Sequence, residues 1–389
     1  MKILVVHNRY LSRGGECSVV DSEINMLKKH GHEVIFYEES NDQINKLSIF
    51  HKIKFFLKEI YFSKKTYSEL TTIIQKEDPD IAHFHNTFLF TSPSAYDACY
   101  DNFIPIVQTL HNYRFLCPNG VFFRNRGICE DCLKVTRKAA IVNKCWHDSY
   151  LASFLITKVV DQFYKRNILS EKINHFIALS EFSKNKFIAN GFDEKKISVK
   201  TNFVYCDDYK YEPHHNYGLY IGHLADYKGV QTLLDAYKNS KNLLKIIGDG
   251  PLLKEVEDAA REYPNIIFLG RMTHEKALSE IRNAKYIVYP AACYETFGRV
   301  VIEAFAYGKP VIVSDSGAPK ELVVNGKTGY VFKSGDSNDL IAKVQMLIEN
   351  ETLIEGMGKN AREEYDSKYT LERNYNILIS IYNKLSQYV

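Results

Sequence analysis

The sequence lacks any long run of apolar residues. No stretch of its 389 residues approaches the roughly 18 uncharged apolar positions that a transmembrane helix needs. The N-terminus holds only the apolar run Ile3–Val6 before polar side chains intervene, which is too short for a secretory signal peptide. We therefore expect a cytoplasmic protein, either free or peripheral on the inner face of the cell membrane.

The sequence also lacks a strong excess of one charge. Lys and Arg total 50 and Asp and Glu total 47, so the net charge is only +3. Nucleic-acid-binding proteins carry a far larger basic excess, and we exclude nucleic acid as a partner. The small total hides an asymmetry: residues 1–205 hold 28 basic and 22 acidic residues (+6), whereas residues 206–389 hold 22 and 25 (−3).

The overall composition is that of an ordinary globular protein. An apolar share of 45% and a charged share of 25% exclude wholesale disorder, collagen-like repeats and a disulfide-stapled mini-domain. At roughly 150 residues per domain, the length predicts two or three domains. Because no secretory signal is present, we expect the eight cysteines to be reduced.

Strand-like and helix-like patterns alternate twice along the chain. In the first half, strands are predicted at 2–7, 33–37, 80–85, 104–110, 175–179 and 197–200, and helices at 18–30 and 182–190. After the polar stretch 206–216, strands are predicted at 219–222, 243–248, 266–270, 286–290, 310–314 and 329–332, and helices at 230–237, 251–262, 274–283, 299–307 and 337–348. This alternation predicts two parallel sheets covered by helices.

The segment Lys46–Lys65 mixes lysines with aromatic and aliphatic residues. Such a basic amphipathic segment suits a helix that packs on its own domain with a solvated lysine face. The alternative is peripheral contact with an anionic membrane surface. Both interpretations stay open on the sequence alone.

The strongest chemical signal surrounds two glutamates, Glu295 and Glu303. Gly298 lies between them at the start of a predicted helix, where a glycine lets a ligand approach the backbone. The unpaired N–H groups of a helix N-terminus favour an anion. Two carboxylates that flank an anion site suit ligands rich in hydroxyl groups, such as a sugar and a ribose.

Four of the eight cysteines are bunched in the sequence. They follow the pattern Cys117-x11-Cys129-x2-Cys132-x12-Cys145 in a segment rich in loop residues. Four thiols with one close pair suit a structural zinc ion that stabilises a loop without a core of its own. Reduced thiols and disulfides are the alternatives.

Two histidines alternate in the predicted strand 80–85. His83 and His85 therefore share one face of that strand near its end. A metal pair or an acceptor contact is one interpretation, and a pair of core or rim histidines is the other.

Short sequence motifs that are typical of one protein family occur along most of the chain. In order, these motifs are Gly14-Gly15-Glu16, Gly31-His32-Glu33-Val34, Pro79–His83, Thr109-Leu110-His111, Ile177–Ser180, Gly222 to Gly229, Gly248–Pro251, Phe268-Leu269-Gly270, Glu295-x7-Glu303, Gly317–Val323 and Asn325–Gly329. In this order and spacing, the sequence resembles the retaining GT-B glycosyltransferases of family 4, of the polysaccharide-biosynthesis type. Similar four-cysteine insertions occur in a branch of that family.

The resemblance implies a GT-B fold, in which two Rossmann-like, doubly wound α/β domains face a central cleft. Residues 1–205 would form the acceptor-side domain, with the cysteine-containing insertion at about 112–150. Residues 206–370 would form the domain that binds the nucleotide sugar. Residues 371–389 would form a C-terminal helix that crosses back to the first domain.

The resemblance also assigns roles to residues. Glu295, His111 and Lys228 would carry catalysis, with Glu295 and His111 at the transferred sugar and Lys228 at the diphosphate. Glu303 would hold the ribose hydroxyls. The residues expected to complete the donor site are Gly14, Gly15, Gly222, His223, Arg271, Met272, Phe297, Gly298 and Arg299.

Two positions depart from the family pattern. His223 stands where the family usually has arginine, and a histidine carries a full charge only near or below pH 6.5. This places more of the diphosphate's charge on Lys228, with Arg299 as a second cation. Arg299 replaces an aliphatic residue of many relatives, and the alternative is that it faces solvent or a neighbouring acid.

The resemblance implies a retaining, hexosyltransferase-type enzyme. It would move a sugar from a nucleotide-diphosphate sugar to a glycan or lipid-linked oligosaccharide in capsule or O-antigen biosynthesis. In the mechanism usually proposed for the family, the acceptor attacks on the leaving-group face and the departing phosphate takes its proton. No cofactor is required for that chemistry. The alternatives are a GT-B nucleotide-sugar epimerase and a non-catalytic sugar-nucleotide-binding or interaction protein.

Overall fold

A computed structural model describes the chain except for residues 11–14, 47, 207–208, 210–214 and 387–389. The chain forms two compact units. The first unit consists of Met1–Gly120, Glu130–Thr201 and Asn374–Val389. The second consists of Val121–Cys129 and Asn202–Arg373. Each unit is built around one sheet of parallel strands.

The sheet of the first unit has the strand order β2-β1-β3-β4-β7-β8. Its strands are β1 Lys2–Arg9, β2 Glu33–Ser40, β3 Ile81–Phe84, β4 Ile106–Leu110, β7 His175–Ala178 and β8 Ile197–Val199. The pairing of Ile3 with both Val34 and Ile81 fixes the register at the centre. Residues Ile3–Val6 are at most 1% exposed, as a strand covered on both faces requires.

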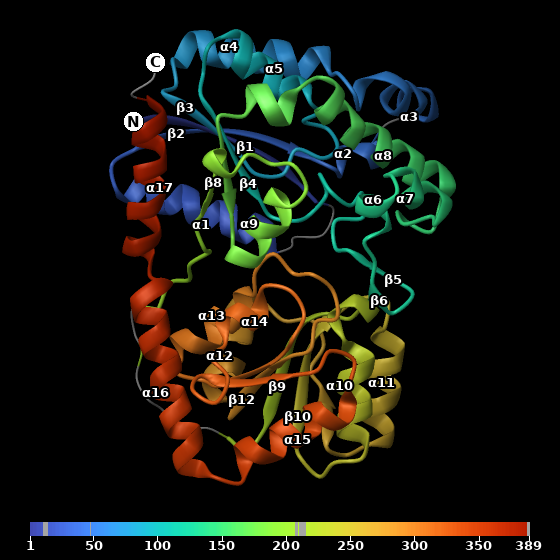
Figure 1. Cartoon of the computed structure of the whole chain (residues 1–389), viewed down its shortest axis with the longest axis vertical. Helices are drawn as coiled ribbons and strands as arrows, with labels where there is room; N and C mark the ends of the chain where they lie inside the picture. The colour runs from blue at the N-terminus through green and yellow to red at the C-terminus, as the bar shows by residue number, and fades with distance from the viewer. Residues whose placement is uncertain (11–14, 47, 207–208, 210–214, 387–389) are drawn as a thin grey trace. The chain divides into compact units, whose positions relative to one another are not determined.

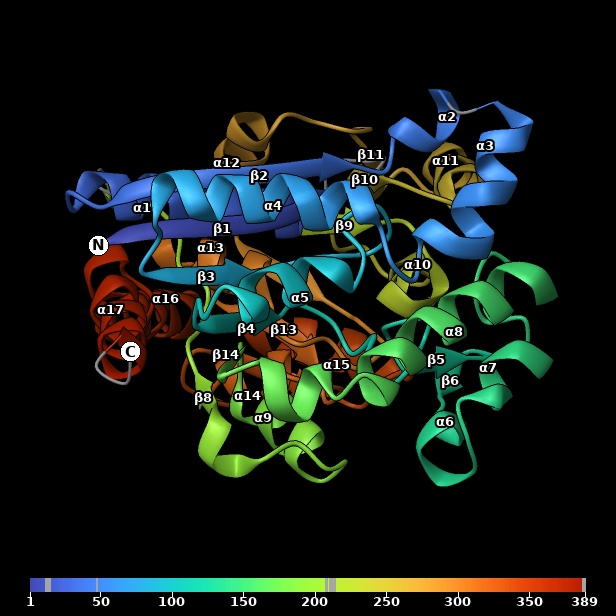
Figure 2. The ribbon, with the colours of Figure 1, turned by 90° about the horizontal axis from the view of Figure 1, so that it is seen from above.

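Helices cover both faces of this sheet. Figure 1 shows α4 and α5 on one face and α1 on the other, and Figure 2 shows α4 and α5 lying along the strands. The helices of the first unit are α1 Gly15–Lys29, α2 Gln43–Lys46, α3 Ile49–Lys54, the π-helix η1 Phe55–Glu59, α4 Lys64–Glu77, α5 Ser94–Asp101, α6 Asp131–Lys134, α7 Lys138–Val142, α8 Tyr150–Lys165, the π-helix η2 Ile168–Lys172, α9 Glu181–Ile188 and the 3₁₀-helix η3 Glu194–Lys196.

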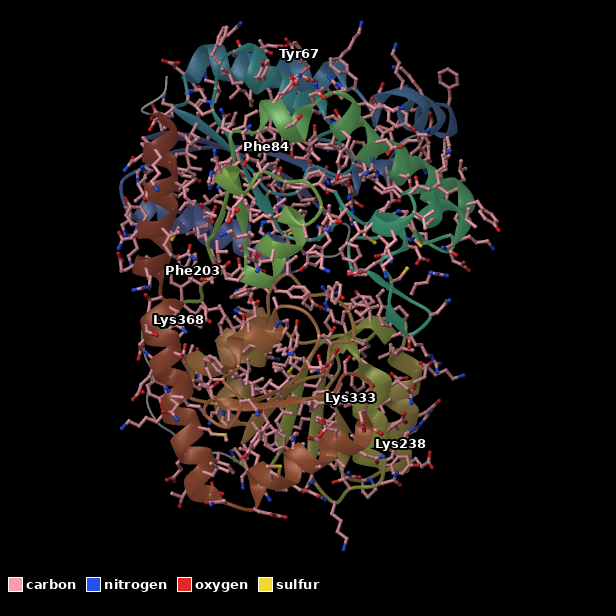
Figure 3. The ribbon with its side chains drawn as sticks, in the orientation of Figure 1. Tyr67, Phe84, Phe203, Lys238, Lys333 and Lys368 are labelled. Carbon is pink, nitrogen blue, oxygen red and sulfur yellow. The ribbon has the colours of Figure 1, made fainter. Side chains whose placement is uncertain are left out.

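Aromatic side chains fill the core between the sheet and these helices. Phe84, labelled in Figure 3, stacks on Tyr96 of α5 with ring centres 4.2 Å apart. Phe163 of α8 packs edge-on against Tyr96 at 5.4 Å. All three side chains are at most 1% exposed, so α5 and α8 are held on the sheet mainly by apolar burial.

The C-terminal helix α17, Leu371–Ser386, packs on the first unit from Asn374 onward. The Tyr375 hydroxyl hydrogen-bonds the Nε2 atom of His32 at 2.9 Å, and the Tyr382 hydroxyl lies 2.6 Å from His83 Nδ1. The Asn374 side-chain amide donates to the carbonyl oxygen of Thr201. Helix α17 therefore packs on the unit that also contains β1.

The sheet of the second unit has the strand order β11-β10-β9-β12-β13-β14. Its strands are β9 Gly218–His223, β10 Leu244–Asp249, β11 Ile266–Phe268, β12 Tyr286–Tyr289, β13 Val311–Ser314 and β14 Gly329–Phe332. Its helices are the 3₁₀-helix η4 Asp226–Lys228, α10 Val230–Lys238, α11 Leu253–Glu262, α12 His274–Asn283, α13 Arg299–Ala306, α14 Pro319–Leu322, α15 Ser337–Ile348 and α16 Glu351–Lys368. Figure 1 shows α10 and α11 on one side of this sheet and α12 and α13 on the other.

The predicted double alternation of strands and helices is confirmed, and both sheets are parallel. One segment of the predicted insertion differs, because Val121–Cys129 groups with the second unit. It forms a hairpin of β5 Phe123–Arg124 and β6 Gly127–Ile128. Across the described parts of the chain, none of the helices combines the length and apolar character needed to cross a bilayer.

Candidate active site

The loops that follow β9 and β12 bring Lys228 and Glu295 together in the second unit. Lys228 ends the short helix η4, and its ammonium group donates a hydrogen bond to Glu295 Oε1. Burial alone would lower the pKa of Lys228, but the Glu295 carboxylate outweighs it and holds that pKa well above its usual value. The pair therefore presents a positive charge directly beside a carboxylate.

Contacts from the neighbouring β13 loop hold Glu295 in place. The Ser316 hydroxyl donates to the Cys293 carbonyl oxygen at 3.1 Å, and the Ala318 amide donates to the Glu295 carbonyl oxygen at 3.1 Å. Gly317 lies between them at a φ of +70°, and a Cβ atom there would come within 2.7 Å of the Glu295 amide nitrogen. Only glycine fits this position without a shift of the backbone.

Glu303 lies in the second turn of α13 and is only 6% exposed. Its Oε1 atom is 3.0 Å from Arg299 Nε and 3.9 Å from His274 Nε2. Burial raises the pKa of Glu303, while Arg299 and His274 oppose that rise. Arg299 thus faces a neighbouring acid, which is one of the two alternatives for this residue.

Gly298 and Phe297 connect the two glutamates. Gly298 is the N-cap of α13, and a Cβ atom there would lie 3.0 Å from the Val301 side chain. Phe297 is 5% exposed and lies beside Tyr369. The loop therefore leads directly into a helix N-terminus, where the first N–H groups and the helix dipole favour an anion.

The other residues that the sequence predicts for the donor site belong to both units. Gly222 and the exposed His223 end β9, and Arg271 and Met272 follow β11 in the same unit. Because carboxyl ends of parallel strands share one edge of a sheet, these residues lie along the edge that carries the Lys228 and Glu295 loops. Gly15 begins α1 of the first unit, and Gly14 lies outside the described residues.

The hairpin β5–β6 adds two aromatic contacts that the sequence did not predict. The Phe122 ring lies 5.8 Å from the Tyr294 ring, next to Glu295. The Phe123 ring lies 6.4 Å from the Tyr227 ring, next to Lys228. The signal that would have found them is the pair of phenylalanines inside an otherwise polar loop.

His111 follows β4 at the carboxyl edge of the first sheet. Its Nε2 atom hydrogen-bonds His85 Nδ1 at 2.8 Å, and His85 in turn faces Glu23 of α1. Glu23 is not among the site residues predicted from the sequence. Its position inside the apolar stripe of Val19, Val20, Ile24 and Leu27 nevertheless indicates a buried carboxylate. Lys200, which pairs with Glu23, was missed as well.

Three of the four bunched cysteines interact in the first unit. A hydrogen bond with Cys117, burial and the proximity of Cys145 all raise the pKa of Cys132. A thiol whose pKa is raised in this way stays protonated until a cation such as zinc binds it as the thiolate. Cys129 ends the β6 hairpin, in the segment that groups with the second unit.

Family models match both halves of the chain. The model described as Glycosyltransferase Family 4 matches residues 13–208, and the model described as Glycosyl transferases group 1 matches residues 210–364. The chain therefore belongs to glycosyltransferase family 4 and is a glycosyltransferase by family.

Relatives and solved structures agree with this assignment. The chain is 27% identical over 392 residues to an uncharacterized glycosyltransferase of Methanocaldococcus jannaschii, which covers 99% of both chains. It is 28% identical to the capsular polysaccharide biosynthesis glycosyltransferase CapM of Staphylococcus aureus, over 60% of this chain and 65% of that one.

Two solved structures share the fold at low sequence identity. Sucrose-phosphate synthase of Thermosynechococcus elongatus superposes with a TM-score of 0.73 at 17% identity over 100% of both chains. HepE of Anabaena in complex with UDP-glucose gives a TM-score of 0.68 at 17% identity, covering 98% of this chain and 99% of that one. The fold is thus GT-B.

Proposed function

We propose that the protein is a retaining glycosyltransferase that transfers a sugar from a nucleotide-diphosphate sugar to a glycan or lipid-linked glycan of a surface polysaccharide. The observation that carries the proposal is the Lys228–Glu295 ion pair next to the N-terminus of α13, with Glu303 one turn further along. This arrangement offers one cation, one helix terminus and two carboxylates to a ligand that has a diphosphate and two sugars.

Each group has a task in that reaction. Negative charge grows on the departing diphosphate as the anomeric C–O bond breaks, and Lys228 and the first N–H groups of α13 stabilise it. Glu295 accepts a hydrogen bond from the transferred sugar, and Glu303 accepts from the ribose. His111 contacts the transferred sugar. The departing phosphate takes the proton of the attacking acceptor hydroxyl, so the protein need not supply a base.

The names and bound ligands of similar proteins support the proposed classes of donor and acceptor. HepE of Anabaena was solved with UDP and with UDP-glucose, and CapM of Staphylococcus aureus is named for capsular polysaccharide biosynthesis. An O-antigen chain mannosyltransferase of Escherichia coli is 27% identical over 44% of this chain. These matches favour a nucleotide-sugar donor and a polysaccharide acceptor.

A lipid-linked acceptor requires contact with a membrane, and we propose such contact for the first unit. In the predicted segment Lys46–Lys65, the Phe50 side chain is 74% exposed, while Phe55 is buried. Helix α8 belongs to the same unit, and its side chains Tyr150, Leu151 and Phe154 are 60%, 68% and 42% exposed. Lys144 and Lys158 lie over the Tyr150 and Phe154 rings. Exposed apolar groups flanked by lysines suit the surface of an anionic bilayer.

We also propose that Cys117, Cys129, Cys132 and Cys145 bind a structural zinc ion. Four thiolates suit tetrahedral zinc, and the hydrogen bond between Cys132 and Cys117 brings two of the four thiols together. The ion would stabilise the loops on either side of the β5–β6 hairpin. It would have no role in the sugar transfer.

A donor panel tests the proposed function. The purified protein is incubated with UDP-, GDP- and dTDP-sugars, with and without lipid acceptors extracted from cells. We expect nucleotide release with one class of donor and a product of unchanged anomeric configuration. An epimerised nucleotide sugar would instead indicate an epimerase. Tight nucleotide binding without turnover of any donor would indicate a non-catalytic binder.

A further inference from the structure

A cavity of about 440 Å³ lies at the carboxyl end of β2 in the first unit. It is lined by Glu39 near the end of β2, by η1, by the first turn of α4 and by Phe90 in the loop after β3. Figure 2 shows α3, which contributes Lys54, beyond the end of β2. Small-molecule sites have volumes of roughly 300–1,000 Å³, and none of the described lining residues belongs to the donor site proposed above. The cavity is therefore a candidate site for a second ligand.

Lysines outnumber glutamates around this cavity. Its charged lining residues are Lys54, Lys58, Lys64, Lys65, Glu39 and Glu59. Lys54 Nζ lies 3.0 Å from Glu59 Oε1, and Lys65 Nζ lies 3.5 Å from Glu39 Oε1. Among the residues that the structure describes, Lys58 and Lys64 form no ion pair with a carboxylate. These two ammonium groups can therefore pair with an anionic group of a ligand.

Glu39 gives the cavity a buried hydrogen-bond acceptor. Its side chain is 8% exposed, and the Tyr37 hydroxyl donates to its Oε1 atom at 3.2 Å while the Gln43 amide donates to its Oε2 atom. A carboxylate has about four acceptor positions, of which Tyr37, Gln43 and Lys65 occupy at most three. Because a second anion would be repelled there, the remaining position suits a neutral donor such as a hydroxyl group.

Aromatic rings form the apolar part of the cavity wall. Phe90 is half-buried and stacks on the buried Phe55, with ring centres 4.4 Å apart. Phe62, another lining residue, is half-buried as well. Small-molecule sites combine such rings with a few polar groups that fix the orientation of the ligand. Rings, a carboxylate and two ammonium groups match a sugar, which offers a C–H face and hydroxyl groups, provided that it also carries an acidic group.

The cavity and His111 lie at the same edge of the first sheet. Glu39 is near the carboxyl end of β2, and His111 follows the carboxyl end of β4, at the edge where ligands of parallel α/β sheets bind. In the strand order β2-β1-β3-β4, three spacings of roughly 4.8 Å separate the two strands, which gives about 14 Å. A short oligosaccharide spans such a distance, so a glycan that reaches His111 can place another of its sugars in the cavity.

We propose that this cavity binds an acidic sugar of the acceptor glycan, with Lys58 and Lys64 at its carboxylate or phosphate group and Glu39 at one of its hydroxyl groups. The inference rests on the proposed function, in which a growing glycan is the acceptor, and it names the class of that acceptor as an anionic polysaccharide. A bilayer is the other anionic partner that lysines could meet. A buried carboxylate in a hollow suits a sugar hydroxyl better than a broad anionic surface, which it would repel.

Free sugars test the binding in the absence of any donor. Glucuronic acid, glucose 6-phosphate and glucose share one ring, and only the first two carry an acidic group. In titrations followed by saturation-transfer NMR, we expect one or both acidic sugars to bind about 3- to 30-fold more tightly than glucose, as two exposed ion pairs would produce. The preference should shrink as salt is added. Equal binding of all three sugars, or no binding of either acidic sugar, would overturn the proposal.

Two double variants locate the binding. Lys58→Met with Lys64→Met removes both ammonium groups and should reduce the preference for the acidic sugar to less than about twofold. Both side chains are exposed, so the fold should not change. Lys28→Met with Lys29→Met makes the same change of charge at the end of α1 and should keep the preference. An equal loss in the two variants would show a general charge effect and would count against the cavity.

Transfer and vesicle assays separate this proposal from its neighbours. With the acceptor extract of the donor panel, Lys58→Met with Lys64→Met should raise the apparent acceptor KM by about 3- to 30-fold and leave the donor KM within about twofold.

Vesicles of phosphatidylglycerol and phosphatidylcholine probe the bilayer. If the variant loses vesicle binding but keeps its preference for acidic sugars, the two lysines serve the bilayer and the proposal fails. Preference for acidic sugars without any transfer would contradict the proposed function and support the cavity as an acidic-sugar site. Transfer by a protein that shows no such preference would contradict this inference alone.

Discussion

Lys228 and Glu295 form an ion pair between two loops of one unit, and their side chains are 23% and 19% exposed. The pair holds an ammonium group and a carboxylate in place before any ligand arrives. A bound diphosphate would take over the ammonium group and leave the carboxylate to a sugar hydroxyl. Such preorganisation lowers the cost of arranging charges during the reaction.

The first prediction concerns Lys228. We expect Lys228→Met to weaken the binding of nucleoside diphosphates by about 10- to 100-fold, because a hydrogen bond to a charged group contributes about 1.5–3 kcal/mol. Binding of the nucleoside alone should not change. Calorimetry with UDP, GDP and dTDP measures the loss. Lys238→Met, at the end of α10 in the same unit and labelled in Figure 3, is the matched control. Equal weakening by both variants would point to a general charge effect.

The second prediction concerns Glu303 and the ribose. A buried carboxylate that accepts from a ribose hydroxyl should make the protein prefer a ribonucleotide over its 2′-deoxy analogue by about tenfold or more. Glu303→Gln should remove most of this preference. Competition between UDP and 2′-deoxy-UDP measures it, or the corresponding pair for another base. Glu275→Gln, on the exposed face of α12, is the control. If Glu303→Gln keeps the preference, Glu303 does not hold the ribose.

The third prediction concerns acid stability of the first unit. Burial lowers the pKa of His7 to about 3 and of His83 to about 4, from 6.5 in the unfolded chain. The unfolded state therefore binds more protons below pH 6.5, and stability that is present above pH 6.5 is lost as the pH falls toward 4. The slope is up to roughly 1.4 kcal/mol per pH unit for each histidine.

Fluorescence of the single tryptophan measures this slope. Trp146 belongs to the first unit and reports its unfolding midpoint at pH 7.5 and pH 5. We expect a lower midpoint at pH 5, and a smaller difference in His7→Asn. His51→Gln, at an exposed position of the same unit, should leave the difference unchanged. A midpoint that rises on acidification would contradict the assignment of neutral buried histidines.

The fourth prediction concerns zinc. Protein purified from zinc-supplied cells should contain about one equivalent of zinc, and Cys132→Ser should lose it. Cys99→Ala, which changes a buried thiol of α5, is the control and should keep the metal. Elemental analysis decides between the outcomes. Less than about half an equivalent in the unsubstituted protein would count heavily against the site.

The fifth prediction concerns the membrane. We expect the protein to sediment with vesicles that contain anionic lipids and to bind less at high salt, because lysines contribute to the attraction. Leu151→Ser with Phe154→Ser should weaken sedimentation, since both side chains are exposed on α8. Ile267→Ser, at a 36% exposed position of the second unit, is the control. Unchanged sedimentation of the α8 variant would exclude that helix from the contact.

Most of the fold was predictable from the sequence because local patterns carry it. Apolar strands such as Ile3–Val6 and amphipathic helices such as α1 have periods that neighbouring residues reveal. The grouping of the hairpin Val121–Cys129 with the second unit was not predictable in this way. It depends on aromatic contacts of Phe122 and Phe123 with residues more than a hundred positions away.

The candidate site was predictable only where it is local. Glu295, Gly298 and Glu303 lie on one loop and one helix, so their spacing alone indicates an anion site between two carboxylates. Glu23 and Lys200 are 177 positions apart, and no local pattern connects them. His85 was visible as a strand residue, but its contacts with Glu23 and His111 depend on the fold.

The most direct test of the account compares sugar transfer by the protein and by its Glu295→Ala variant, with the donor that the panel identifies. Transfer and nucleotide binding are measured on the same preparations. The account predicts that Glu295→Ala lowers transfer by about 100-fold or more and changes the affinity for the nucleoside diphosphate by only a few-fold. Near-normal transfer by Glu295→Ala would contradict it.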